Sequence, residues 1–158
     1  MVSGPGRVLV ACVGNVLRSD DGFGPAVAGR LVGLPPNVEL LETGIGGIAL
    51  LQELLVGCDG LVVVDALDRG EPPGTVLVLR PEVAEYDGIP DMHLATPERV
   101  LSLAQGMGVL PERLLLVGCQ AIDAETVGEN LSAPVARAVP VAADAVLRIV
   151  RDWAPGTV

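Results

Sequence analysis

The sequence predicts an α/β fold, a three-layer sandwich in which helices flank a mostly parallel central sheet of about five strands. Short apolar runs rich in β-branched residues alternate along the chain with longer segments of helical period. Several of these runs are apolar at nearly every position, which is typical of strands buried on both faces. The chain has 158 residues, and no repeat or linker divides it, so we expect a single domain over residues 1–158.

The strands are predicted from the apolar runs and from the turn residues that bound them. The first run, 8–13, is almost wholly apolar, and the third ends on Asp65. The fourth follows a loop rich in Gly and Pro, so we expect it to be an edge strand or an antiparallel partner. The five predicted strands cover residues 8–13, 38–41, 61–64, 75–79 and 114–117.

Capping and stop signals predict the helices. Thr96 is an expected N-cap, with Pro97 at the first helical position and Glu98 in the first turn. Pro140 lies within the last helical segment, where we expect it to kink or divide the helix. Residues 81–92 show no period and are predicted to form a loop. The predicted helices cover about 24–34, 48–56, 97–105 and 132–152.

The composition excludes several classes of function. The chain contains no Lys, which excludes a Walker lysine, a Schiff-base lysine and a Ser–Lys pair. The net charge of −10 and an aromatic content of 2% argue against a nucleic-acid partner, because a phosphate backbone would be repelled and stacking platforms are missing. His93 is the only histidine, so one chain cannot supply a multi-histidine metal site.

The cysteines and the hydropathy indicate a cellular compartment. An odd count of three, Cys12, Cys58 and Cys119, predicts buried free thiols in a reducing environment. No apolar stretch approaches the roughly 20 residues that span a bilayer, and the short run at 8–13 is not followed by a cleavage site. We therefore expect a cytoplasmic protein without a membrane partner. Nothing in the sequence predicts an obligate dimer, so a monomer is expected.

Acidic residues follow two of the predicted strands. Asp20 and Asp21 follow the first strand, and Asp65 and Asp68 follow the third, so all four are expected at one edge of the sheet. A divalent cation would offset this charge, and two carboxylates with the imidazole of His93 would form a three-ligand site. The alternatives stay open: turn and N-cap chemistry for the Asp pair, a loop cap for Asp65, and an ordinary imidazole for His93.

One motif points to a family. Gly14-Asn15-Val16-Leu17 followed by Asp20-Asp21-Gly22-Phe23-Gly24 resembles the signature of the hydrogenase maturation endopeptidases. These enzymes remove a C-terminal extension from the large-subunit precursor of nickel–iron hydrogenase. The resemblance extends over about residues 7–152, and its weaker segments cover 42–47, 62–66, 92–93 and 116–120.

The resemblance implies a set of site residues. Asp21, Asp65 and His93 would be the catalytic residues and would contact the metal, which is nickel carried by the precursor. Residues with an expected role in substrate binding are Asn15, Glu42, Thr43 and Gly44. Glu42 stands where the family usually has Asp, Ile45 where it often has Thr, and Leu94 where a polar residue often follows the histidine.

The implied reaction is metal-assisted peptide hydrolysis, with a carboxylate accepting the proton of the attacking water and no organic cofactor. Two alternatives are kept. One is a hydrolase of the same family with its own metal and another precursor. The other is a non-catalytic checkpoint module that docks on a nickel-bearing partner.

Overall fold

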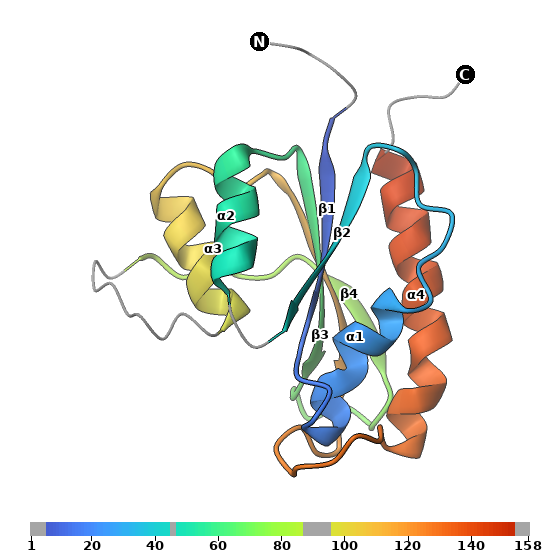
Figure 1. The fold of residues 1–158 in the computed structure, drawn as a ribbon. Helices are drawn as coiled ribbons and strands as arrows, with labels where there is room; N and C mark the ends of the chain where they lie inside the picture. Colours follow the sequence, from blue (N-terminus) through green and yellow to red (C-terminus); the bar gives the residue numbers. More distant parts are fainter. Residues whose placement is uncertain (1–5, 45–46, 87–95, 154–158) are drawn as a thin grey trace.

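A five-stranded sheet runs through the middle of the molecule, with helices on both faces (Figure 1). The structure, a computed structural model, describes residues 6–44, 47–86 and 96–153. Its strands are β1 (Val8–Val13), β2 (Val38–Gly44), β3 (Gly60–Leu67), β4 (Val76–Leu79) and β5 (Arg113–Gln120). Its helices are the 3-10 turn η1 (Ser19–Gly22), α1 (Phe23–Ala28), α2 (Ile48–Val56), α3 (Pro97–Gly106) and α4 (Ala133–Trp153).

The sheet has the order β2-β1-β3-β5-β4, which confirms the predicted architecture. β1 pairs in parallel with both β2 and β3, and β3 pairs in parallel with β5. β4 is an edge strand and is antiparallel to β5, as expected from the loop that precedes it. After β1 the chain forms β2 on one side and later β3 on the other. The carboxyl ends of β1 and β3 are therefore the topological switch point, where ligands bind in open α/β sheets.

Each face of the sheet is buried under two helices, α1 and α4 on one side and α2 and α3 on the other (Figure 1). Side chains of β3 alternate between the two cores. Val62 and Val64 pack on the α1/α4 side, whereas Leu61 and Val63 pack on the α2/α3 side. By this alternation Asp65 faces the α2/α3 side, which decides where its carboxylate can act.

Two predicted boundaries were wrong in ways that matter for the site. β3 and β5 continue to Leu67 and Gln120, because these residues still pair with each other. Asp65 therefore lies inside β3 and does not end it. Helix α1 ends at Ala28, six positions before the predicted end, because Gly29 follows and glycine is a poor helix former.

Two further expectations about helices were met only in part. Pro140 lies inside α4, yet α4 is a single helix of 21 residues. The loss of one backbone donor is tolerated because its apolar face, including Val139 and Ala142, is buried against the sheet. Thr96 occupies the N-cap position of α3 with an extended backbone, but its side chain makes no capping hydrogen bond.

Two glycines allow the chain to fold back tightly after β1. Gly14 has a φ of 143°, and a Cβ there would meet the carbonyl oxygen of Asp21 at 1.9 Å. A Cβ on Gly24 would meet the carbonyl oxygen of Val13 at 2.1 Å. The motif at residues 14–24 therefore needs glycine at both positions to seat η1 and α1 against the end of β1.

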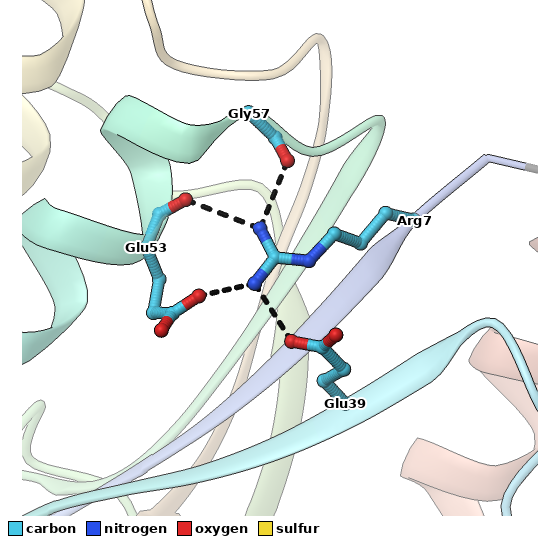
Figure 2. Close-up of polar contacts among 4 residues, drawn as sticks. All are labelled: Arg7, Glu39, Glu53 and Gly57. Atoms are coloured by element: carbon cyan, nitrogen blue, oxygen red, sulfur yellow. Dashed lines mark hydrogen bonds and ion pairs between the residues drawn. The ribbon is translucent and has the colours of Figure 1, made fainter. Parts of the chain in front are cut away.

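At the opposite end of the sheet, Arg7 ties β1 to its neighbours (Figure 2). Its guanidinium donates to the backbone oxygens of Glu53 and Gly57 and to the carboxylates of Glu39 and Glu53. The hydrogen bond and charge of Arg7 hold the pKa of Glu39 below its ordinary value. This cluster joins β1, β2 and α2, and it lies far from the acidic edge.

All three cysteines are free. Cys12 and Cys119 are buried as expected, whereas Cys58 is only half-buried because it lies in the turn between α2 and β3. Among the described residues, no helix is both long and apolar enough to span a membrane.

Candidate active site

Asp21 and Asp65 reach the switch point from different elements. Asp21 belongs to η1, which directly follows β1, and Asp65 belongs to β3, the neighbour of β1 in the sheet. The two carboxylates are close enough that the charge of Asp21 raises the pKa of Asp65. The expected meeting of the acidic residues at this edge is therefore observed for this pair.

The loop itself holds the carboxylate of Asp21 in place. The backbone N–H of Asn15 donates to Asp21 Oδ2 at 2.8 Å, and the Oδ1 atom of Asn15 accepts from the N–H of Leu17 at 2.9 Å. Asn15, expected to bind substrate, thus shapes the turn that presents Asp21. The second carboxylate oxygen of Asp21 makes no hydrogen bond that we observe within the described residues.

Asp65 carries the perturbed carboxyl group of the site. Burial is the largest cause that raises its pKa to about 8, and the negative charges of Asp21 and Glu98 contribute to the same rise. A hydrogen bond from the backbone of Ala66 opposes these effects without cancelling them. In the isolated protein Asp65 is therefore mostly protonated at pH 7, and a nearby cation would favour its ionised form.

Asp65 lines a pocket of about 360 Å³ between β3 and α3. The apolar part of the wall comes from the α2/α3 core, including Val63 and Leu101. The charged residues that line it are Asp65, Asp68, Arg69, Glu82 and Glu98. Four acidic side chains against one guanidinium make the pocket acidic, so it is suited to a cation or a cationic group.

Glu98 is a functional candidate that sequence reasoning missed. The sequence marked it only as an acidic residue in the first turn of a helix. The fold places that first turn beside Asp65, where both Pro97 and Glu98 line the pocket. The sequence did predict that a helix starts near Glu98. It could not predict that this helix lies beside β3, because that position depends on tertiary packing.

Asp20, the neighbour of Asp21, has a structural role. It is fully buried, and it accepts hydrogen bonds from the backbone N–H groups of Ile122, Asp123 and Ser132 and from the Ser132 hydroxyl, at 2.7–3.1 Å. Burial alone would raise the pKa of Asp20, but these hydrogen bonds outweigh it and the pKa is lowered. Asp20 therefore does not cap the first helix, as the alternative supposed, and it holds the distant β5–α4 loop in place instead.

Gln120 fixes the loop that follows β3. It is buried, and its Oε1 atom accepts from the N–H groups of Arg69 at 2.7 Å and Glu71 at 3.3 Å. Its Nε2 atom donates to Asp68 Oδ1 and to the carbonyl oxygen of Ala121, both at 3.0 Å. Every polar group of the side chain is used, and two residues that line the Asp65 pocket are thereby held in position.

Of the remaining candidates, Glu42 and Thr43 lie in β2, which ends at Gly44. Glu42 pairs with Cys12, and burial together with the charge of Glu42 raises the pKa of that thiol to about 12. Because Cys12 belongs to the α1/α4 core, Glu42 lies toward the other side of the sheet from Asp65.

His93 lies outside the described residues. Within the described ranges, no group of three or more His, Cys, Asp or Glu side chains is arranged to hold a metal ion. Asp21 and Asp65 are the members of the predicted trio that the structure brings together.

Comparison with known proteins agrees with this architecture. The hydrogenase expression/formation proteins HupD of Rhizobium leguminosarum bv. viciae and Rhodobacter capsulatus are 39% and 38% identical to this chain. These matches cover 93% and 94% of this chain and 75% and 73% of those proteins.

Solved structures give the same result. The hydrogenase maturating endopeptidase HybD from E. coli superimposes with a TM-score of 0.78 at 30% identity, over 92% of this chain and 93% of that one. The [NiFe] hydrogenase maturation protease HycI from Thermococcus kodakarensis gives a TM-score of 0.73 at 25% identity, over 94% and 95%. The model of the hydrogenase maturation protease family matches residues 28–149. This chain therefore belongs to the hydrogenase maturation protease family, and it is a peptidase.

Proposed function

We propose that this protein removes the C-terminal extension of a [NiFe]-hydrogenase large-subunit precursor by hydrolysing one peptide bond. The observation that carries the proposal is the close approach of Asp21 and Asp65 at the switch point, with Asp65 held protonated in an acidic pocket. The family of the chain and the maturation endopeptidases that share its fold support the class of substrate.

The metal in this proposal is nickel that arrives with the precursor, so it is part of the substrate. The residues fit such a cation: one carboxylate from η1 and one from β3 provide oxygen ligands, and their mutual repulsion is relieved when a positive charge lies between them. His93 is the proposed third contact. When bound there, nickel would mark the correctly loaded precursor and polarise the scissile carbonyl or the attacking water.

The protein's own groups would then move the proton. Asp65 would release its proton to solvent when the cation binds, and a carboxylate of the pair would then accept a proton from the attacking water. The water oxygen bonds to the carbonyl carbon and the C–N bond breaks. The proton passes to the leaving amine, so the carboxylate is regenerated. Asn15 keeps Asp21 in position throughout through its backbone N–H.

The finer cellular assignments are also proposals. Three free thiols fit a reducing compartment, so we propose that the protein acts in the cytoplasm. We propose that it acts as a monomer, because the net charge of −10 disfavours self-association.

The test uses purified precursor in nickel-loaded and nickel-free forms, with mass spectrometry of the released C-terminal peptide. We expect release only from the nickel-loaded form. Equal release from both forms would contradict the role of substrate nickel. Binding of loaded precursor without any release would favour the checkpoint module. Metal found in the protein purified alone would favour a resident metal.

Variants test the residues. Asp21→Asn and His93→Ala are expected to lose at least about 100-fold in peptide release with an unchanged unfolding temperature. Asp144→Asn, at an exposed position on α4, removes one carboxylate away from the site and is the matched control. A variant that still cleaves at the wild-type rate would remove its residue from the mechanism.

A further inference from the structure

Four large apolar side chains are exposed together at the carboxyl end of the sheet. Val16 and Leu17 are each about half exposed in the loop after β1, at 53% and 52%, while Ile122 and Val127 in the β5–α4 loop are exposed by 59% and 83%. Of the other exposed large apolar residues of the described chain, Ile48, Leu55 and Val56 lie on α2, and the rest lie singly on β2, β4, α4 and two loops. We call these four residues the Leu17–Val127 patch.

The backbone brings the two loops of the patch together (Figure 1). The N–H of Gly128 donates to the carbonyl oxygen of Leu17 at 2.9 Å, and the N–H of Ser19 donates to the carbonyl oxygen of Gly128 at 2.8 Å. Arg18 and Gly128 form a parallel bridge, which sets Leu17 beside Val127.

The loops are also fixed in place. The carboxylate of Asp20 binds the N–H of Ile122, and the hydroxyl of Ser19 donates to the carbonyl oxygen of Thr126 at 2.9 Å. Ser19 keeps a positive φ of 51°, which a serine adopts only where its surroundings hold it. The apolar side chains are therefore presented on a rigid surface, which lowers the entropy lost when a partner binds.

The charge that borders the patch is mainly negative, although the exposed guanidinium of Arg18 also lies beside Leu17. Asp123, Glu125 and Glu129 lie in the same loop as Ile122 and Val127, and a second pocket of about 320 Å³ is lined by Asp68, Asp123 and Glu125 beside Ile122. A second copy of this chain would bring the same carboxylates and a further charge of −10 against this border. A partner with an apolar surface bordered by cationic side chains would match the patch in hydrophobicity and its border in charge.

We propose that the Leu17–Val127 patch docks the folded body of the precursor, which would present an apolar surface bordered by cations. This inference rests on the proposed function. Asp21 lies in the same loop as Val16 and Leu17, and its N–H donates to the carbonyl oxygen of Arg18 at 3.0 Å. The patch and Asp21 therefore share one edge of the sheet, so a substrate whose terminal segment reaches Asp21 has the patch within reach of its adjoining surface.

The test compares two double variants that remove equal numbers of exposed apolar side chains. Leu17→Ser/Val127→Ser changes the patch. Val32→Ser/Val56→Ser is the matched control, since both valines are 75% exposed and lie before β2 and at the end of α2, away from the carboxyl edge. The dissociation constant for nickel-loaded precursor is measured by sedimentation with His93→Ala added to every protein, so that the precursor stays intact, and KM and kcat are measured from peptide release without that change.

We expect the patch variant to raise the dissociation constant and KM roughly tenfold, with kcat within about twofold of wild type. The control should match wild type, and both variants should keep the wild-type unfolding temperature. Replacing Glu125 and Glu129 by Gln should weaken binding a few-fold and reduce its dependence on salt.

An unchanged dissociation constant in the patch variant would overturn the docking proposal. A wild-type dimer that the patch variant dissociates would also overturn it, because the occupant would then be a second copy. Failure of the proposed function is distinguishable, since wild type would release no peptide while the binding measurement still tests the patch.

Discussion

Asp20 and Asp65 are both buried or largely buried acids at the same edge of the sheet, but their surroundings differ. Three backbone N–H groups and one hydroxyl bind the carboxylate of Asp20, and its pKa is lowered. Asp65 faces Asp21 and Glu98, and its pKa is raised to about 8. Burial therefore does not by itself mark a functional acid. The number of donors and the sign of the neighbouring charges separate the carboxylate that holds the fold from the one available for chemistry.

The strongest test of this contrast is Asp65→Asn. We expect peptide release to fall roughly 1,000-fold or more, because the pair loses an ionisable ligand and proton acceptor. The folded protein should nevertheless become more stable at pH 8, by about 2 kcal/mol or about 5 °C in unfolding temperature.

The pH dependence of the stability gain from Asp65→Asn follows from the raised pKa of Asp65 in the native state. The native state keeps the proton of Asp65, whereas the unfolded chain releases it above the ordinary carboxyl value of 3.8. Wild-type stability therefore falls as the pH rises from about 4 to about 8, and the gain from Asp65→Asn grows over that range. Thermal unfolding at pH 4, 6 and 8 checks this, and a variant less stable than wild type at pH 8 would contradict the assignment.

Asp20→Asn should have the opposite effect on stability. The amide replaces an acceptor that several N–H groups need, so we expect a loss of about 3 kcal/mol at pH 7, measured by urea unfolding. Because the pKa of Asp20 is lowered in the native state, its contribution is present above the ordinary value and is lost as the pH falls through the native one. A variant as stable as wild type at pH 7 would show that the β5–α4 loop is held by other contacts.

The smallest effect is expected from Glu98→Gln. Removing this charge should lower the pKa of Asp65, as followed by carbon-13 NMR titration of its carboxyl group. Glu112→Gln, in the loop before β5 at the other end of the sheet, is the control and should leave that pKa unchanged. Identical titration curves for wild type and Glu98→Gln would exclude α3 from the electrostatics of the site.

The sequence predicted the layers, the strand count and the antiparallel edge, because continuous apolar runs and helical periods report burial directly. It also placed acids at the switch point, since topology sends the residues after β1 and those late in β3 to one edge. Asp20 and Asp21 could not be told apart. Their separate roles depend on donors at Ile122, Asp123 and Ser132, about one hundred positions further along the chain.

Long-range packing also explains why the sequence did not reveal the roles of Glu98 and Gln120 or the end of β3. Glu98 reaches Asp65 only because α3 packs over β3, and Gln120 fixes the Asp68–Glu71 turn across a separation of 52 positions from Asp68. The end of β3 was placed too early because pairing with β5 keeps Ala66 and Leu67 in the strand, although the apolar run before Asp65 had ended. Such pairing has no local sequence signal.

The reactivity of two buried thiols can be used to follow the opening of the α1/α4 core. Cys12 in β1 and Cys119 in β5 pair with Val64 and Ala66 on opposite sides of β3. Burial raises the pKa of these thiols to about 12 and about 11, so neither forms an appreciable thiolate at neutral pH. Both thiols lie in the core between the sheet and helices α1 and α4, so alkylating reagents can reach them only after this core opens, and the rate of thiol modification measures that opening.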